Sequence, residues 1–222
     1  MGMFKLSMWV KKVSVVVILV LLVLSTVVAV HFFVNRVNLT RVACLGDSIT
    51  ESYGYPEYLQ VLLGEGSTVA NFGATRVTVN LQSSDPYYYK LDFQELKDFN
   101  PTTVVLMLGT NDVRIDNCLK VDTFVDDYKF LISKIQNQTS ASSIFLVIPP
   151  PVFDNGVELN CTFLSDKIIP CIQQVADEEN LPLIDLYTPM FDCSEHFFDG
   201  VHPDKVGVQI ITQIIYDTIK AY

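Results

Sequence analysis

Short apolar segments alternate with amphipathic segments along most of this chain, and this alternation limits the possible fold more than any other feature. Five segments, most of them apolar, are predicted to be strands, at residues 41–45, 67–71, 102–108, 143–148 and 183–186. Strands that alternate with helices predict a parallel sheet with right-handed crossovers and a helical layer on each face. We therefore expect an α/β protein, a three-layer α/β/α sandwich built on a five-stranded parallel sheet.

The segments between these strands have the spacing of helices or the composition of loops. Helices are predicted at residues 56–63, 93–99, 122–136, 165–179 and 204–219. The clearest is 122–136, whose apolar side chains recur along one helical face. Residues 80–90 are polar and rich in tyrosine, which predicts a loop.

A different pattern precedes the first strand. Residues 13–34 carry no formal charge, and as a helix they would be about 33 Å long, which matches a bilayer core of about 30 Å. We predict a transmembrane signal-anchor at 13–34, a cytoplasmic tail at 1–12, a linker at 35–40 and a domain at 41–222. The lysines before the span place the domain in the lumen or outside the cell. Cleavage of the N-terminal segment is the alternative, and the domain would then be secreted.

Charge and cysteine content narrow the setting further. Four basic residues and no acidic one precede residue 41, so the rest of the chain carries a formal charge of −14 against a total of −10, which disfavours nucleic acid as a partner. In a secretory compartment, Asn137 and Asn160 are predicted glycosylation sites. Two disulfides are predicted in that compartment, with the pairing left open. The cysteines concerned are Cys118, Cys161, Cys171 and Cys193. Cys44, inside the first strand, is predicted to be free and buried.

Polar residues follow the predicted strands at the sheet edge where α/β proteins carry their ligand sites. Ser48 follows the first strand and is a candidate nucleophile, although a serine after a turn can also serve as a helix N-cap. Gly73 follows the second strand, where its backbone N–H can approach a substrate closely. Asn111 follows the third strand and carries an amide that can donate to an oxyanion.

The loop before the last helix completes a catalytic set. In Asp199-Gly200-Val201-His202, the aspartate can reach one ring nitrogen of His202 and leave the other free to take a proton from serine. Asp47 and Asp112 are predicted to be structural, accepting backbone N–H groups to tie loops together. No close Cys/His spacing typical of zinc is present in the sequence, and neither a metal nor a cofactor is expected.

With these motifs in place, the chain resembles the SGNH (GDSL-type) hydrolases over about residues 41–222. The family's blocks are similar to Gly46-Asp47-Ser48-Ile49-Thr50, Asn71-Phe72-Gly73, Gly109-Thr110-Asn111-Asp112 and Asp199 to His202, in the family's order. The resemblance implies a flavodoxin-like fold with Ser48 as nucleophile, His202 as base and Asp199 as its partner. It also implies an oxyanion hole made of the Ser48 and Gly73 N–H groups and the Asn111 amide.

The resemblance also implies a reaction. Residues 181–187 and 198–203 are similar to bacterial carbohydrate acetylesterases, including sialate O-acetylesterase-like members. We therefore expect a serine esterase that removes a small acyl group, acetyl in the first place, from a hydroxyl-rich substrate such as an O-acetylated glycan. The alternatives are a lysophospholipase or short-chain lipid esterase, and an inactive glycan-binding module. The oligomeric state is left open.

Overall fold

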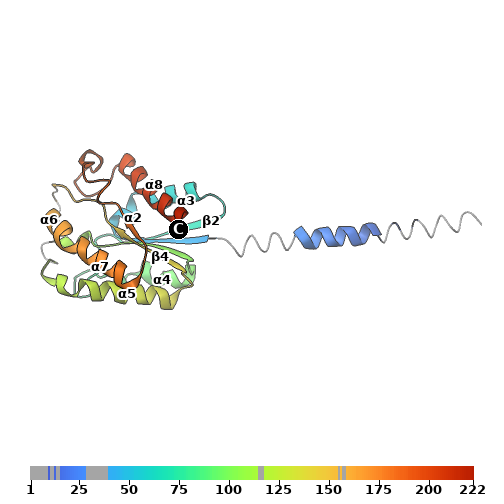
Figure 1. Ribbon diagram of the computed structural model, residues 1–222, viewed down its shortest axis with the longest axis horizontal. Helices are drawn as coiled ribbons and strands as arrows, with labels where there is room; N and C mark the ends of the chain where they lie inside the picture. Colours follow the sequence, from blue (N-terminus) through green and yellow to red (C-terminus); the bar gives the residue numbers. More distant parts are fainter. Residues whose placement is uncertain are drawn as a thin grey trace, which may run out of the picture. The chain divides into compact units, whose positions relative to one another are not determined.

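The computed structural model describes residues 10, 13, 16–28, 40–114, 118–154, 156 and 159–222, without the side chains of 118–120. Residues 40–222 form one compact unit, separate from residues 1–39. Its centre is a parallel sheet in the order β2-β1-β3-β4-β5 (Figure 1). The strands are β1 Thr40–Gly46, β2 Ser67–Gly73, β3 Thr103–Met107, β4 Ser143–Ile148 and β5 Leu183–Asp185. Because the order reverses between β1 and β3, their carboxyl ends flank the crevice in which such sheets bind ligands.

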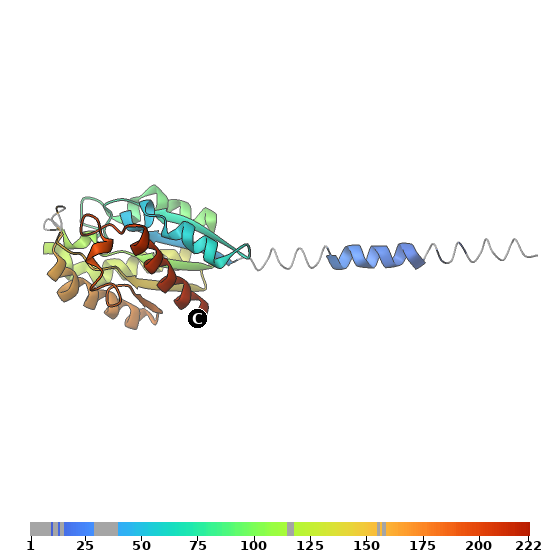
Figure 2. The ribbon, with the colours of Figure 1, turned by 90° about the horizontal axis from the view of Figure 1, so that it is seen from above.

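Helices cover both faces of this sheet. The helices are α2 Ser48–Ser52, α3 Tyr55–Leu63, α4 Leu91–Phe99, α5 Phe124–Gln138, α6 Cys161–Phe163, α7 Ile169–Glu179 and α8 Lys205–Ala221. Helices α3 and α8 lie side by side over one face, and α4, α5 and α7 cover the other (Figures 1 and 2). The predicted three-layer sandwich with five parallel strands is confirmed.

Successive side chains of a strand point to opposite faces of the sheet, so each strand contributes to the core under both helical layers. In β1, Val42 and Cys44 join the core under α3 and α8, whereas Ala43 and Leu45 join the core under α4, α5 and α7. All four side chains are fully buried. A strand covered on both faces must be apolar at every position, which is why these segments are continuous apolar runs.

Short elements supplement the predicted ones. The 3₁₀ helices are η1 Tyr87–Tyr89, η2 Asn111–Val113, η3 Cys118–Thr123 and η5 Ser194–His196. A π-helical turn, η4 Leu164–Ile168, joins α6 to α7, so this helical stretch begins before the predicted residue 165. Pro170 follows the π turn at the start of α7, where its missing N–H and its ring are tolerated.

The predicted transmembrane segment is only partly visible. Residues 16–28 are helical, which corresponds to about 20 Å of helix. Among the described residues, no helix is long and apolar enough to cross a membrane. Residues 14–15 and 29–34 of the predicted span lie outside the described residues, as do residues 35–39 of the predicted linker, whose last residue, Thr40, begins β1.

The predicted disulfides are not found among the cysteines whose side chains the structure describes, a group that leaves out Cys118. Cys161, Cys171 and Cys193 are free thiols. Cys161 and Cys171 lie about 15 Å apart along one helical stretch, and Cys171 packs on the opposite side of the sheet from Cys193. A disulfide requires Cα atoms within about 7 Å. Cys44 is free and buried as predicted, and burial raises the pKa of its thiol to about 12.

The predicted glycosylation sites are both on the surface. Asn137 is exposed near the end of α5. Asn160 is exposed at the N-terminus of α6, where its Oδ1 accepts the Phe163 N–H at 3.0 Å. Exposure is compatible with modification, which stays a prediction.

Candidate active site

Ser48 lies at the carboxyl end of β1, in the first turn of α2. Asp47 is the N-cap of this helix, and its Oδ1 accepts the Ile49 N–H at 3.0 Å. Ser48 is therefore not the cap, and its hydroxyl is available for other contacts. A Cβ at Gly46 would lie 2.1 Å from Thr50 Oγ1 and 2.7 Å from the Met107 carbonyl oxygen, so the turn requires glycine.

A chain of hydrogen bonds connects Ser48, His202 and Asp199. Ser48 Oγ lies 2.9 Å from His202 Nε2, and His202 Nδ1 lies 2.7 Å from Asp199 Oδ2. Ser48 and His202 are 154 positions apart in the sequence, and the sheet edge brings them together. With the proton on Nδ1, the other ring nitrogen can accept the serine proton.

Asp199 is held by its own turn. Its Oδ1 accepts the backbone N–H groups of His202 at 2.8 Å and Val201 at 3.0 Å, while Oδ2 faces the imidazole. Partial burial opposes ionisation, but the hydrogen bonds from the His202 ring and from the two N–H groups outweigh it and lower the pKa of Asp199. The carboxylate is thus charged at neutral pH and fixes one ring nitrogen as a donor.

Aromatic rings fix the orientation of the imidazole. Tyr53 stacks on His202 with ring centroids 4.8 Å apart and planes 21° apart. The ring of Phe198 also stacks on His202, with ring centroids 6.1 Å apart and planes 26° apart. Tyr53 directly follows α2, which carries Ser48, and Phe198 directly precedes Asp199.

Asn111 and Asp112 clamp the loop that follows β2. Asn111 is buried, and its Nδ2 donates to the Val77 carbonyl at 3.1 Å. The two carboxylate oxygens of Asp112 accept the Val79 and Asn80 N–H groups, each at 3.1 Å. Asp112 therefore has the loop-tying contacts predicted for it, and it holds residues 77–80 against the active-site edge.

The predicted oxyanion role of Gly73 requires a backbone N–H that faces the substrate, but this N–H is already hydrogen-bonded within the protein. Its N–H donates to Asn71 Oδ1 at 3.0 Å, and Asn71 Nδ2 donates to the Thr50 and Glu51 carbonyls at 2.9 Å and 3.1 Å. A Cβ at Gly73 would lie 2.3 Å from the Glu51 backbone nitrogen. These contacts pack β2 against α2 and so position Ser48.

The pocket in front of Ser48 is small, with a volume of about 150 Å³. Its described lining consists of Ser48, Thr75, Arg76, Thr110, Asn111, Arg114, Leu159, Val201 and His202. Sequence reasoning did not single out Thr75, Arg76 or Arg114. Arg76 adopts a left-handed conformation with φ 65°, which a polar loop sequence does not reveal. Gly73 is absent from this described lining.

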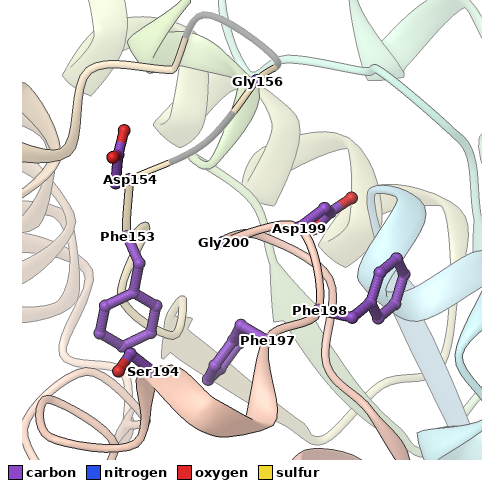
Figure 3. A pocket seen from close by; sticks show the side chains of 8 residues that line it. All are labelled: Phe153, Asp154, Gly156, Ser194, Phe197, Phe198, Asp199 and Gly200. Atoms are coloured by element: carbon purple, nitrogen blue, oxygen red, sulfur yellow. The ribbon is translucent and has the colours of Figure 1, made fainter.

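A second, open pocket of about 660 Å³ is lined by Asp199 and Gly200, which belong to the turn that also carries His202 (Figure 3). Figure 3 shows the rings of Phe153 and Phe197 along its lower side, with Asp199 and Gly200 across from them. The Phe153 N–H donates to the Gly200 carbonyl at 2.8 Å, which ties the loop after β4 to the Asp199 turn. This pocket has an aromatic wall next to the hydrogen-bonded chain.

Two buried carboxyl groups lie beneath the site. Burial raises the pKa of Asp47 to about 6, against the lowering effects of the Ile49 N–H and the Thr110 hydroxyl. Burial raises the pKa of Asp112 to about 7, although the Val79 and Asn80 N–H groups oppose the shift. Within the described ranges, no group of three or more His, Cys, Asp or Glu side chains could hold a metal ion.

Comparison with known proteins agrees with this geometry. The profile of the GDSL-like lipase/acylhydrolase family matches residues 44–210, which include every member of the hydrogen-bonded chain. The chain belongs to the GDSL-like lipase/acylhydrolase family. The resemblance to SGNH hydrolases seen in the sequence is thereby confirmed.

Among relatives in the GDSL-like family, an acetylxylan esterase from Xylanibacter ruminicola is 32% identical over 206 residues, covering 81% of this chain and 43% of that protein. The chain spans less than half the length of the curated relatives it matches.

Solved structures of this type include a lipase/acylhydrolase from Enterococcus faecalis, with 25% identity and a TM-score of 0.65 over 82% of this chain and 96% of that one. An acetylxylan esterase from Geobacillus stearothermophilus shares the fold, with 20% identity and a TM-score of 0.64 over 81% of this chain and 94% of that one.

Proposed function

We propose that this protein is a serine esterase that removes a small acyl group, acetyl in the first place, from a hydroxyl-rich substrate such as an O-acetylated glycan. The observation that carries the proposal is the hydrogen-bonded chain Ser48–His202–Asp199, with links of 2.9 Å and 2.7 Å at a pocket open to substrate. A nucleophile, a base and an orienting carboxylate in this arrangement are what acyl transfer requires.

The reaction then has two halves. Ser48 Oγ attacks the ester carbonyl while His202 Nε2 takes its proton, and Asp199 stabilises the resulting imidazolium. Collapse of the tetrahedral intermediate expels the alcohol, which receives the proton from His202 and leaves an acyl-serine. Water, deprotonated by His202, attacks the acyl-serine, and the carboxylic acid departs as Ser48 regains its proton.

The negative oxygen of each tetrahedral intermediate needs hydrogen-bond donors. Ser48 occupies the first helical position of α2, where an N–H has no partner within its own helix. Asn111 lines the same pocket and has an amide with two N–H donors, one of which holds the Val77 carbonyl. We propose Ser48 N–H and Asn111 as donors. Gly73 enters the proposal only if its hydrogen bond to Asn71 opens when substrate binds.

Pocket size supports a small acyl group. The Ser48 pocket, at about 150 Å³, is below the roughly 300–1,000 Å³ of sites that enclose drug-sized ligands. The neighbouring aromatic pocket, lined by Phe153 and by the exposed ring of Phe198, offers apolar surface on which a sugar ring can stack. The relative from Xylanibacter ruminicola, 32% identical, is an acetylxylan esterase, which supports the same kind of ester for this chain.

A series of esters tests the proposal. For the purified full-length protein, kcat/KM for 4-nitrophenyl esters should fall steeply from acetyl to butyryl and be negligible at octanoyl. The Ser48→Ala variant, purified in parallel, controls for contaminating esterases. Faster cleavage of octanoyl esters or of lysophosphatidylcholine would favour the lipid esterase alternative, and no turnover of any ester would favour a glycan-binding module.

We also propose, from the uncharged sequence of residues 13–34 alone, that the N-terminal segment anchors the chain in a membrane with the catalytic domain lumenal or extracellular. The full-length protein should then stay in the membrane pellet after carbonate extraction. Protease added to sealed microsomes should spare the domain. Recovery of the protein in the carbonate supernatant would exclude the anchor.

A further inference from the structure

Two arginines line the pocket in front of Ser48. Arg76 comes from the loop after β2, and Arg114 follows the 3₁₀ turn that carries Asn111. Arg76 is exposed, and among the described residues its guanidinium has no hydrogen bond or ion pair. A nearby carboxylate, Asp85, is ion-paired to Lys90 at 2.9 Å and feels Arg76 only as a weaker, distant charge.

The backbone at Arg76 adds a second observation. With φ 65° this residue is in the left-handed region, which glycine adopts at lower cost than any residue with a Cβ. The conformation is enforced from the next residues onward, where Asn111 holds the Val77 carbonyl and Asp112 holds the Val79 N–H. Residues in such sparsely populated conformations cluster at active sites, so the conformation supports a role for the Arg76 side chain at this pocket.

We propose that Arg76 binds a carboxylate group of the substrate at the pocket that Arg114 also lines, so that the preferred ester is an O-acetylated sugar acid rather than a neutral acetylated sugar. This inference rests on the proposed esterase function and names its substrate class. A guanidinium presents paired N–H donors that match the two oxygens of a carboxylate. Bound in this way, the acid group positions the neighbouring acetyl ester at Ser48 Oγ.

The overall charge of the protein limits the number of acidic groups on the substrate. Residues 41–222 carry −14, which repels polyanions at long range. A sugar bearing one carboxylate experiences a much smaller repulsion, and the Arg76 guanidinium at the pocket compensates for it. The inferred substrate is therefore a mono- or oligosaccharide with few acidic groups rather than a highly charged polymer.

A matched pair of substrates tests this inference. Acetylated glucuronic acid and acetylated glucose differ in the carboxylate, and acetate release by the full-length protein gives kcat/KM for each. The wild type should prefer the acid. Arg76→Gln should lower the acid-to-neutral ratio of kcat/KM about tenfold or more, the effect of losing a hydrogen bond to a charged group. Arg76→Lys keeps the charge without the paired donors and should retain part of the preference.

The control is Lys97→Gln, which removes an exposed positive charge on α4 away from both pockets and should leave the ratio unchanged. Free glucuronate should inhibit 4-nitrophenyl acetate hydrolysis more strongly than glucose does, and this difference should shrink in Arg76→Gln. Equal kcat/KM for the two sugars in the wild type, or an equal loss on both in Arg76→Gln, would overturn the carboxylate inference. Failure of the wild type to hydrolyse 4-nitrophenyl acetate would instead overturn the esterase proposal itself.

Discussion

Substituting Gly73 by alanine separates two roles that this residue can have. Alanine keeps the backbone N–H, so a residue needed only as an oxyanion donor should tolerate the change. The structure predicts otherwise, because the new Cβ would lie 2.3 Å from the Glu51 nitrogen, 2.6 Å from Glu51 Cα and 2.8 Å from the Thr50 carbonyl carbon. All three are backbone atoms of α2, the helix that begins with Ser48.

The cost follows from the rigidity of those atoms. Adding a methyl group to a packed interior costs about 1–3 kcal/mol of unfolding free energy, and we expect the upper end because no side-chain rotation can relieve a contact with backbone. For a domain of this size, Tm falls by about 2–4 °C per kcal/mol, so Gly73→Ala should lower Tm by about 6–12 °C. Because α2 must move, Ser48 moves with it and kcat should fall as well.

Thermal unfolding by calorimetry and kcat on 4-nitrophenyl acetate, measured on the same samples, check this prediction. Gly66→Ala is the matched control, because a Cβ added at Gly66 would have no heavy atom within 4 Å and the residue has no positive φ. Its Tm should stay level or rise slightly, since alanine restricts the unfolded chain. A Gly73→Ala protein with the Tm and kcat of Gly66→Ala would refute the packing role of Gly73.

Three other substitutions probe the surroundings of Ser48. Asn111→Ala should lower kcat by about 10²–10³, the effect of losing one oxyanion donor, and an unchanged kcat would leave Asn111 with its loop contact alone. Asp199→Asn should lower kcat by about 10⁴ because the imidazole loses the acceptor that fixes its tautomer. The pKa of Asp47 is about 6 in the folded protein and about 4 in the unfolded chain, so between these pH values the folded state binds more protons at this group. The free energy of unfolding therefore falls as pH rises from about 4 to about 6. Asp47→Asn should make the decline shallower and leave the part that is due to Asp112, whose pKa is raised to about 7. Calorimetry from pH 4 to 7 would count against the burial of Asp47 if the two proteins kept parallel Tm profiles.

The inner strands β1, β3 and β4 could be predicted from the sequence because they are buried on both faces. Residues such as Val104, Val105 and Leu106 form continuous apolar runs, and a run of that length between glycine or proline turns has few other interpretations. The short helix α2 was missed, since five residues are too few for a periodic pattern. The start of the α6–α7 stretch was missed because a π-helical turn does not follow the 3.6-residue period.

The placement of the hydrogen-bonded chain was predictable for a related reason. The carboxyl ends of parallel strands lie at the same edge of the sheet. Residues that follow β1 and residues that precede α8 therefore meet at this edge, whatever their separation in sequence. The lining of the pocket was not predictable, because Arg76 reaches it through a left-handed backbone that tertiary contacts to Asn111 and Asp112 impose. The prediction of two disulfides was wrong for the described cysteines, because loop position does not show which side of the sheet a cysteine faces, and Cys171 and Cys193 pack on opposite sides.

The central claim is that Ser48 is the nucleophile, and covalent labelling tests it most directly. The full-length protein is treated with a fluorophosphonate probe, which reacts with activated serine hydroxyls, and the labelled peptide is identified by mass spectrometry. Label on Ser48, abolished in Ser48→Ala and strongly reduced in His202→Ala, is the predicted result. Label on a different serine, or ester turnover that survives in Ser48→Ala, would contradict the account.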